Sequence, residues 1–169
     1  KKFKLNNRTI VLASHNTGKI AEFEALFSKY NVTIQTISTL GIEDIDETGK
    51  TFEENAVIKV KTVPDGSIGL SDDSGLSIKS LNHAPGIYSA RYAKKLGGWS
   101  KAMKELYFEA KKKNGFSATF HCVLALKSED SEISIFKGEV NGKIVWPPRG
   151  ENGFGYDPFF IPWNSKMTF

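Results

Sequence analysis

The chain has 169 residues, of which 40% are hydrophobic and 25% are charged, and its formal net charge at pH 7 is +4. This apolar content can build a sizeable core within one domain, which we expect to span residues 1–169. No apolar run reaches the roughly 18 residues of a membrane-spanning helix, and residues 1–9 lack the apolar segment of a secretory signal. We therefore expect a cytoplasmic protein without a membrane partner.

The single cysteine and the one dense run of lysines exclude or disfavour several kinds of functional site. Cys122 is the single cysteine, so an internal disulfide framework and a cysteine-based zinc site are excluded. It lies in the apolar run 120–126, which predicts a buried structural thiol. Lysines 111–113 have no arginines or interleaved aromatic residues, which favours a solvated helix end over a nucleic-acid site. We expect no nucleic-acid partner, and an RNA-binding module that uses these lysines is kept only as an alternative.

Hydrophobic periodicity predicts alternating strands and helices in the first half of the chain. A short apolar stretch predicts a buried strand over residues 8–14, and apolar residues three and four positions apart predict a helix over residues 17–30. Residues 32–37 alternate between apolar and polar types, which predicts a second strand.

A capping box predicts the start of the next helix, because Thr51 is followed three residues later by Glu54. We expect this helix to continue to about Val63. Asn55 and Lys59 are four residues apart, so their side chains are expected to stand together on one face.

The second half of the chain predicts more strands than helices. Residues 67–71 predict a buried strand that stops at Asp72, and residues 76–78 predict a short returning strand. The remaining predicted elements are a helix over residues 99–113, a hairpin of strands over residues 118–127 and 132–140, and a short strand over residues 144–146. This mixture of buried strands and helices predicts an α/β fold with a mixed sheet.

A candidate phosphate loop, Ser14-His15-Asn16-Thr17-Gly18-Lys19, joins the first predicted strand to the first helix. A helix start offers backbone N–H groups and a positive dipole end, which suit phosphate oxygens, and the lysine adds a charge. The loop is not a Walker A motif, because Ala13 and Ile20 replace its first glycine and its Ser or Thr. Ordinary helix capping by Asn16 or Thr17 is the alternative.

A candidate metal site is indicated by the adjacent carboxylates Asp72 and Asp73 at the end of a predicted strand. Mg²⁺ favours one or two carboxylates together with substrate phosphates. Side chains alternate along a strand, so one of the two aspartates is expected to be a ligand, and Glu47 is a candidate second ligand. A simple polar turn is the alternative.

A glycine-rich aromatic loop, residues 150–158, is the third candidate feature. Its glycines allow a close approach of the backbone to a ligand. Phe154 or Tyr156 could stack on a planar base, and Asp157 could accept hydrogen bonds from ring N–H groups. The alternative is a tight loop whose aromatic side chains complete the core.

Taken together, these motifs resemble those of the inosine triphosphate pyrophosphatase family, also called non-canonical purine NTP pyrophosphatases. The resemblance covers nearly the whole chain and keeps the family's order. It rests on residues 14–19, 47–49 with 51–56, 72–76, 84–92 (Ala-Pro-Gly-Ile-Tyr-Ser-Ala-Arg-Tyr), 120–122 (Phe-His-Cys) and 153–158 (Gly-Phe-Gly-Tyr-Asp-Pro).

The resemblance implies an α/β fold of two lobes around a long mixed β-sheet with flanking helices, with the active site in the cleft between the lobes. It implies Mg²⁺-dependent hydrolysis of the purine nucleoside triphosphates ITP, dITP and XTP to the monophosphate and pyrophosphate. This reaction removes deaminated purines from the nucleotide pool. Members of the family are typically cytoplasmic homodimers.

The resemblance also assigns roles to individual residues of this chain. Ser14, His15, Asn16, Thr17, Gly18 and Lys19 would line the triphosphate. Glu47 and Asp73 would bind Mg²⁺, Asp73 would also be the base for the attacking water, and Lys59 would face the phosphates. Ser74 would touch the substrate, and Phe154, Gly155, Tyr156 and Asp157 would hold the base and sugar.

One part of the family pattern has no counterpart here. Family members continue with a helical tail that carries a substrate-contacting lysine and a Ser-His-Arg segment, whereas this chain ends at Phe169. A non-catalytic nucleotide-binding protein is therefore one alternative. A Maf-like pyrophosphatase acting on dTTP or UTP is another, although the motifs at residues 14–19 and 154–157 argue against it.

Overall fold

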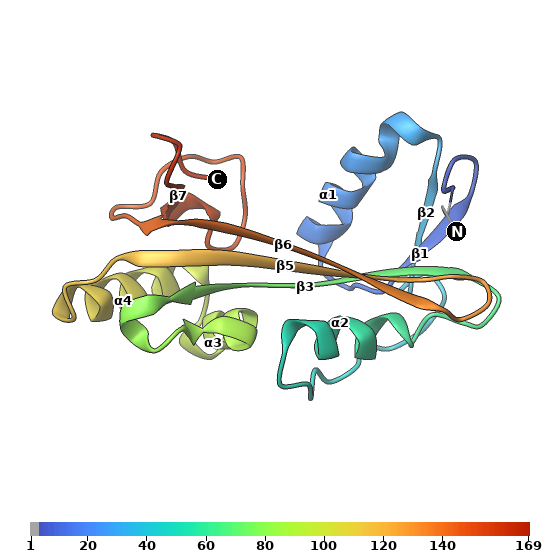
Figure 1. Ribbon diagram of the computed structural model, residues 1–169, viewed down its shortest axis with the longest axis horizontal. Coiled ribbons are helices and arrows are strands. Elements are labelled where there is room, and N and C mark those ends of the chain that lie inside the picture. Colours follow the sequence, from blue (N-terminus) through green and yellow to red (C-terminus); the bar gives the residue numbers. More distant parts are fainter. Residues whose placement is uncertain (1–3) are drawn as a thin grey trace. The chain divides into compact units, whose positions relative to one another are not determined.

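The computed structural model describes residues 4–169, which form a mixed β-sheet with flanking helices (Figure 1). The strands are β1 (Thr9–Leu12), β2 (Thr33–Thr36), β3 (Ile68–Ile78), β4 (Ala84–Pro85), β5 (Ser117–Lys127), β6 (Ile133–Ile144) and β7 (Phe160–Pro162). The helices are α1 (Thr17–Phe27), α2 (Phe52–Val60), α3 (Ser89–Leu96) and α4 (Trp99–Lys112). Short 3₁₀ turns occupy Ser28–Tyr30, Lys79–Leu81, Gly86–Tyr88 and Asp157–Phe159.

The sheet has the strand order β2-β1-β3-β5-β6-β7, and β4 pairs with β3 beside this path. β1 runs parallel to both β2 and β3, whereas β4 is antiparallel to β3 and β7 is antiparallel to β6. β5 and β6 follow one another in the chain and are neighbours in the sheet. The predicted α/β class, the mixed sheet and the late pair of strands are thus confirmed.

The chain divides into two compact units. The first unit holds residues 1–73 and 123–136, and the second unit holds residues 74–122 and 137–169. One boundary falls inside β3, between Asp73 and Ser74.

In the first unit, α1 and α2 cover opposite faces of the sheet. Ile10 and Leu12 of β1 pack with Phe23 of α1, while Val11 on the other face packs with Val63, which follows α2. Side chains of neighbouring residues in a strand point to opposite faces, so this alternation explains the short, fully apolar sequence of β1. The phosphate loop predicted at residues 14–19 therefore leaves the buried end of β1 and enters α1.

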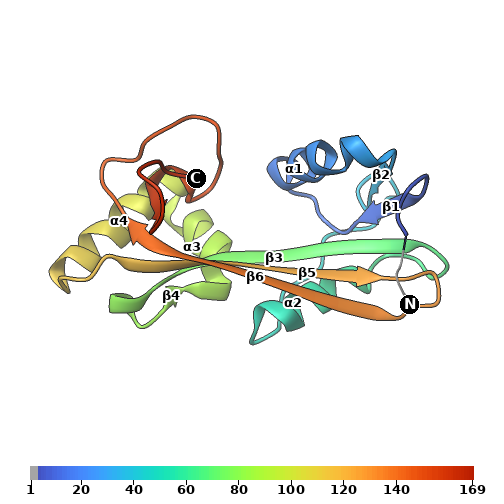
Figure 2. The same ribbon diagram turned by 45° about the horizontal axis from the view of Figure 1, so that its top comes forward.

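The second unit has its own core between the strands and the helices α3 and α4. Its largest buried side chains include Leu76 and Ile78 of β3 together with Phe159 and Phe160. α3 and α4 follow one another in the chain and pack against each other (Figure 2). Aromatic side chains are concentrated here, and Trp99 meets Tyr156 edge to face with ring centroids 4.9 Å apart.

The strand predicted to stop at Asp72 does not stop there. β3 continues without interruption from Ile68 to Ile78, through both aspartates, and the predicted returning strand is simply its end. The prediction was wrong because it treated two adjacent carboxylates as a turn, whereas each of them has a lysine partner in the folded chain.

Three further boundaries differ from the predictions. α1 ends at Phe27, and Tyr30, the last residue of the predicted helix, is 54% exposed. α2 ends at Val60 rather than Val63. The strand expected at residues 144–146 is absent as a separate element, because β6 itself runs to Ile144.

Cys122 is exposed, so the prediction of a buried thiol was wrong. The apolar run did identify a strand, but it could not say which face of the strand is covered. Val123 and Ala125 are buried on the opposite face of β5. Within residues 4–169, no helix is both long and apolar enough to span a membrane.

Candidate active site

The loop between β1 and α1 is shaped by its own side chains. Asn16 is the N-cap of α1, and its Oδ1 accepts hydrogen bonds from the backbone N–H groups of Gly18 and Lys19 at 3.0 and 3.2 Å. Ser14 Oγ accepts a hydrogen bond from the backbone N–H of Asn16 at 3.1 Å. These bonds satisfy donors that a helix start leaves unpaired, and they fix the path of the predicted phosphate loop. The capping that the sequence offered as an alternative is therefore present, and Thr17 is the first helical residue.

His15 uses both ring nitrogens to hold this loop. Nε2 lies 3.1 Å from the Ile42 carbonyl oxygen, and Nδ1 lies 3.0 Å from Ser38 Oγ. A neutral ring that is protonated at Nε2 satisfies both contacts, donating to the carbonyl and accepting from the hydroxyl. His15 therefore connects the loop to the turn after β2, a role that its sequence position did not reveal.

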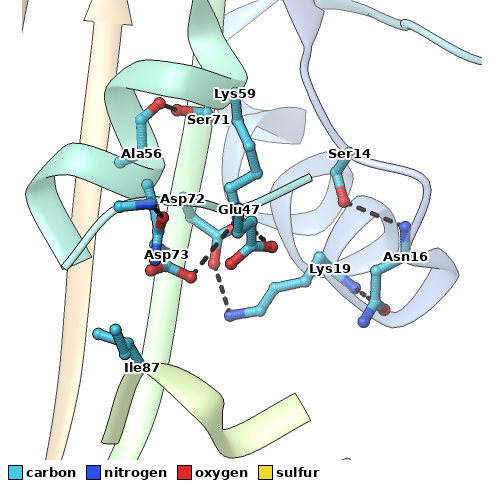
Figure 3. A network of polar contacts seen from close by, with 12 residues as sticks. Ser14, Asn16, Lys19, Glu47, Ala56, Lys59, Ser71, Asp72, Asp73 and Ile87 are labelled. Atoms are coloured by element: carbon cyan, nitrogen blue, oxygen red, sulfur yellow. Dashed lines mark hydrogen bonds and ion pairs between the residues drawn. The ribbon is translucent and has the colours of Figure 1, made fainter. Parts of the chain in front are cut away.

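Two lysines from different helices reach the two aspartates of β3 (Figure 3). Lys19 Nζ of α1 lies 2.8 Å from Asp72 Oδ2. Lys59 Nζ of α2 lies 3.6 Å from Asp73 Oδ1 and also 3.6 Å from Glu47 Oε1. Because α1 and α2 cover opposite faces of the sheet, the alternation predicted for the aspartate pair is confirmed.

Asp73 is the most perturbed carboxylate of this group. The residue is 5% exposed, and its Oδ2 has no hydrogen-bond partner among the residues that the structure describes. Burial raises the pKa of Asp73 to about 7, the nearby Lys59 opposes the rise, and the Glu47 carboxylate adds to it. A carboxyl group with this pKa can exchange a proton near neutral pH, which is the requirement for a general base.

The donor set of this group fits a hard cation. Glu47 and Asp73 offer oxygen ligands, and Asp73 Oδ2 is buried and unpartnered in the described chain. No three His, Cys, Asp or Glu side chains within residues 4–169 gather closely enough to enclose a metal ion by themselves. Mg²⁺ takes one or two protein carboxylates and completes its shell with water and substrate phosphates.

The remaining predicted residues, Ser74 and the loop at Phe154–Asp157, belong to the second unit. Asp157 Oδ2 accepts a hydrogen bond from the Phe154 backbone N–H at 3.0 Å, which closes the loop on itself. A Cβ at Gly153 would lie 2.6 Å from the same oxygen, so only glycine fits there. Gly155 has a φ of 64°, a conformation that also favours glycine.

Tyr156 is anchored inside the second unit. It is 3% exposed, its hydroxyl donates to the Ser89 carbonyl oxygen at 2.9 Å, and burial raises its pKa. Of the two aromatic side chains in this loop, Phe154 is the one with intermediate exposure. The core-completing role that the sequence offered as an alternative thus describes Tyr156.

The first unit brings predicted site residues into direct contact. These are Lys19 with Asp72, and Glu47 and Asp73 each with Lys59. The sequence alone missed the lysine partner of Asp72 and the contacts of Asn55. The spacing of Asn55 and Lys59 was the available signal, since both side chains affect the pKa of the Asp73 carboxyl.

Comparison with known proteins identifies the family of this chain. The model of the Ham1 family matches residues 10–169, and the chain belongs to this family. The dITP/XTP pyrophosphatase of Agrobacterium fabrum is 43% identical over 98% of this chain and 82% of its own length. The dITP/XTP pyrophosphatase of Bacillus licheniformis is 42% identical over 95% of this chain and 85% of its own length.

Solved structures agree with these relatives. A HAM1 protein from Coxiella burnetii has 39% sequence identity and a TM-score of 0.82, over 95% of this chain and 84% of that chain. A dITP/XTP pyrophosphatase from Mycobacterium abscessus has 32% identity and a TM-score of 0.74, over 95% and 86% of the two chains. The resemblance drawn from the motifs is thereby confirmed.

Proposed function

We propose that this chain hydrolyses the non-canonical purine nucleoside triphosphates dITP, ITP and XTP to the monophosphate and pyrophosphate. The observation that carries the proposal is the buried Asp73 carboxylate, which has one unpartnered oxygen and a pKa of about 7 beside Lys59. The names of the relatives supply the substrate class, because relatives matched over 82% and 85% of their own length are dITP/XTP pyrophosphatases.

The first unit supplies the groups that act on the triphosphate. Ser14 to Lys19 form the loop that lines the phosphates, and Lys19 and Lys59 place positive charge beside their oxygens. These lysines neutralise carboxylates in the free protein, so a bound triphosphate competes with Asp72 and Asp73 for them. Charge that develops on the phosphate oxygens during the reaction is offset by the same lysines.

Asp73 accepts the proton of the attacking water. Water attacks the α-phosphorus, because pyrophosphate is the leaving group. Glu47 and Asp73 are the residues that would hold Mg²⁺, which when bound supplies positive charge at the phosphate oxygens. Lys59 contacts both carboxylates and lowers the pKa of Asp73, so that Asp73 is more readily deprotonated and able to act as a base.

The second unit supplies the groups that hold the base and sugar. Phe154 offers a partly exposed ring for stacking, Asp157 an acceptor for ring N–H groups, and Ser74 a further substrate contact. Inosine and xanthosine carry an oxygen acceptor at the purine 6-position, where adenine carries a donor. A site built to donate to that oxygen leaves buried groups unpaired with adenine and so rejects it.

Magnesium dependence, a cytoplasmic homodimer and the removal of deaminated purines from the nucleotide pool complete the proposal. They are supported by the oxygen donor set at Glu47 and Asp73 and by membership in the Ham1 family.

A nucleotide panel tests this function. Pyrophosphate release is measured with dITP, ITP, XTP, GTP, ATP, dTTP and UTP, each with Mg²⁺ and with EDTA. We expect Mg²⁺-dependent turnover of dITP, ITP and XTP, with kcat/KM for ATP and GTP about 5- to 150-fold lower, since one misplaced polar group costs about 1–3 kcal/mol.

Two outcomes of the panel would point to the alternatives. Turnover restricted to dTTP and UTP would indicate a Maf-like pyrophosphatase. Binding of dITP without release of pyrophosphate would indicate a nucleotide-binding protein that does not catalyse the reaction.

A further inference from the structure

Asn55 of α2 is a fully buried amide that none of the steps above uses. It is 0% exposed, and it lies one helical turn before Lys59 on the same helix. A buried primary amide is costly unless its donors and acceptor are used. The contacts of its two ends therefore indicate what it does.

The oxygen end of Asn55 holds the segment that carries Glu47. Asn55 Oδ1 accepts a hydrogen bond from the Gly49 backbone N–H at 2.8 Å. An ideal Cβ at Gly49 would lie 2.6 Å from this oxygen and 2.9 Å from the Asn55 backbone nitrogen, so the segment sits directly against the helix. Because a backbone N–H can only donate, this contact also fixes which end of the amide is the oxygen.

The nitrogen end of Asn55 has no hydrogen-bond partner among the described residues. The amide lies close enough to the Asp73 carboxyl to oppose the rise of its pKa, yet Nδ2 makes no hydrogen bond of good geometry in the described chain. Asp73 Oδ2 is the other buried side-chain atom without a partner there. Each of these two buried groups therefore needs a partner beyond the described side chains, such as water or an ion.

We infer that Asn55 is a positioning residue for the acidic site, because its side-chain oxygen holds the segment that carries Glu47 through the Gly49 backbone N–H. This contact fixes where Glu47 stands relative to Asp73, the other carboxylate that would hold a divalent cation. This inference rests on the proposed function for its catalytic consequence, but the geometry of cation binding is independent of the substrate.

The test uses two variants that break the same contact from opposite sides. Asn55→Ala removes the amide, and Gly49→Ala places a methyl group against Asn55 Oδ1 while leaving the core of α2 intact. Val60→Ala is the control for the first, since Val60 is fully buried on the same helix and packs in an apolar cluster with Val123 and Ala125. Gly138→Ala is the control for the second, because a Cβ there meets nothing within 4 Å.

Binding of Mn²⁺ is measured by the paramagnetic broadening of backbone amide signals from α2 and from residues 68–73, after circular dichroism has confirmed folding. Loss of a residue that positions a metal ligand typically lowers metal affinity 10–100-fold. We therefore expect both variants to bind Mn²⁺ at least about tenfold more weakly than the unaltered chain. The two controls should remain within about twofold of the unaltered chain. With dITP, both variants should lose kcat while KM changes less than about threefold.

The outcomes separate this inference from the proposed function. A folded Asn55→Ala variant with unaltered Mn²⁺ affinity overturns the inference. If Asn55→Ala does not fold, unaltered Mn²⁺ binding by Gly49→Ala overturns it instead, as does an unaltered chain that binds no Mn²⁺. Weakened Mn²⁺ binding in both variants, with no turnover of dITP by the unaltered chain, supports the inference and contradicts the proposed function.

Discussion

Each aspartate at the centre of β3 is matched by a lysine from a different helix. Lys19 pairs with Asp72, and Lys59 pairs with both Asp73 and Glu47. Taking carboxylates out of water is costly, and a partner recovers that cost only in part when contacts are as long as 3.6 Å. The ionised Asp73 carboxylate therefore lowers the free energy of unfolding of the chain.

The free energy of unfolding of Asp73→Asn should show this directly. The pKa of Asp73 is raised from 3.8 to about 7 in the folded chain, so between these pH values the folded state binds a proton that the unfolded state releases. The cost of Asp73 therefore grows as pH rises through this window and is constant above about 7. We therefore expect the stability advantage of Asp73→Asn over the unaltered chain, measured as the free energy of unfolding, to increase by on the order of 2 kcal/mol from pH 5 to pH 8.

Denaturant unfolding in EDTA at both pH values measures this difference. Asp130→Asn is the control, because Asp130 is exposed. A gain from Asp73→Asn that is the same at pH 5 and pH 8 would show that the Asp73 carboxyl titrates at its ordinary value.

At the residue scale, local spacing predicted the helix cap at Asn16 but not the contacts between segments far apart in the chain. Asn16 as an N-cap and Asn55 beside Lys59 both follow from local spacing. The contacts of His15 with Ser38 and Ile42 join segments more than 20 residues apart. No local pattern encodes such a pairing, which depends on how β1 and β2 lie in the sheet.

Among the elements, α2 is the one that gathers the acidic site. Thr51 Oγ1 accepts a hydrogen bond from the Glu54 backbone N–H at 3.1 Å, as the capping box predicts. Glu54 Oε2 accepts from the Lys50 backbone N–H at 2.6 Å, one residue before the cap. Ser71 Oγ then donates to the Ala56 carbonyl oxygen, which ties the helix to β3.

Thr51→Ala tests the contribution of this cap. Loss of an N-cap hydroxyl costs about 1 kcal/mol, so the free energy of unfolding should fall by that amount. Urea unfolding followed by circular dichroism gives the value. Ser100→Ala, at an exposed position in α4, should change the free energy by less than about 0.5 kcal/mol. Equal effects of the two substitutions would contradict the capping role.

Elements with clear periodicity were predictable, and short elements were not. The helices at α1, α2 and α4 were expected within a few residues of their bounds. α3 and β7 were missed, since eight and three residues give too short a pattern to recognise. The sequence prediction divided β3 into two strands, because two adjacent carboxylates are typical of a turn when their lysine partners are not known.

For the whole molecule, the order of the motifs was more informative than the count of elements. Composition and strand patterns predict an α/β protein, and the six ordered motifs point to the family that the Ham1 match confirms. The division into two compact units, with a boundary inside β3, has no signature in the sequence. A boundary within one continuous strand leaves no linker, glycine-rich stretch or change of composition to mark it.

At the scale of the whole molecule, the proposed reaction cleaves the bond between the α- and β-phosphates of a deaminated purine nucleotide. Hydrolysis of dITP in ¹⁸O-labelled water with Mg²⁺, followed by mass spectrometry of the products, shows which phosphorus the water attacks. We expect dIMP that carries one ¹⁸O atom, and pyrophosphate without label. Release of orthophosphate, label in the pyrophosphate, or no turnover at all would contradict attack of water on the α-phosphorus by this chain.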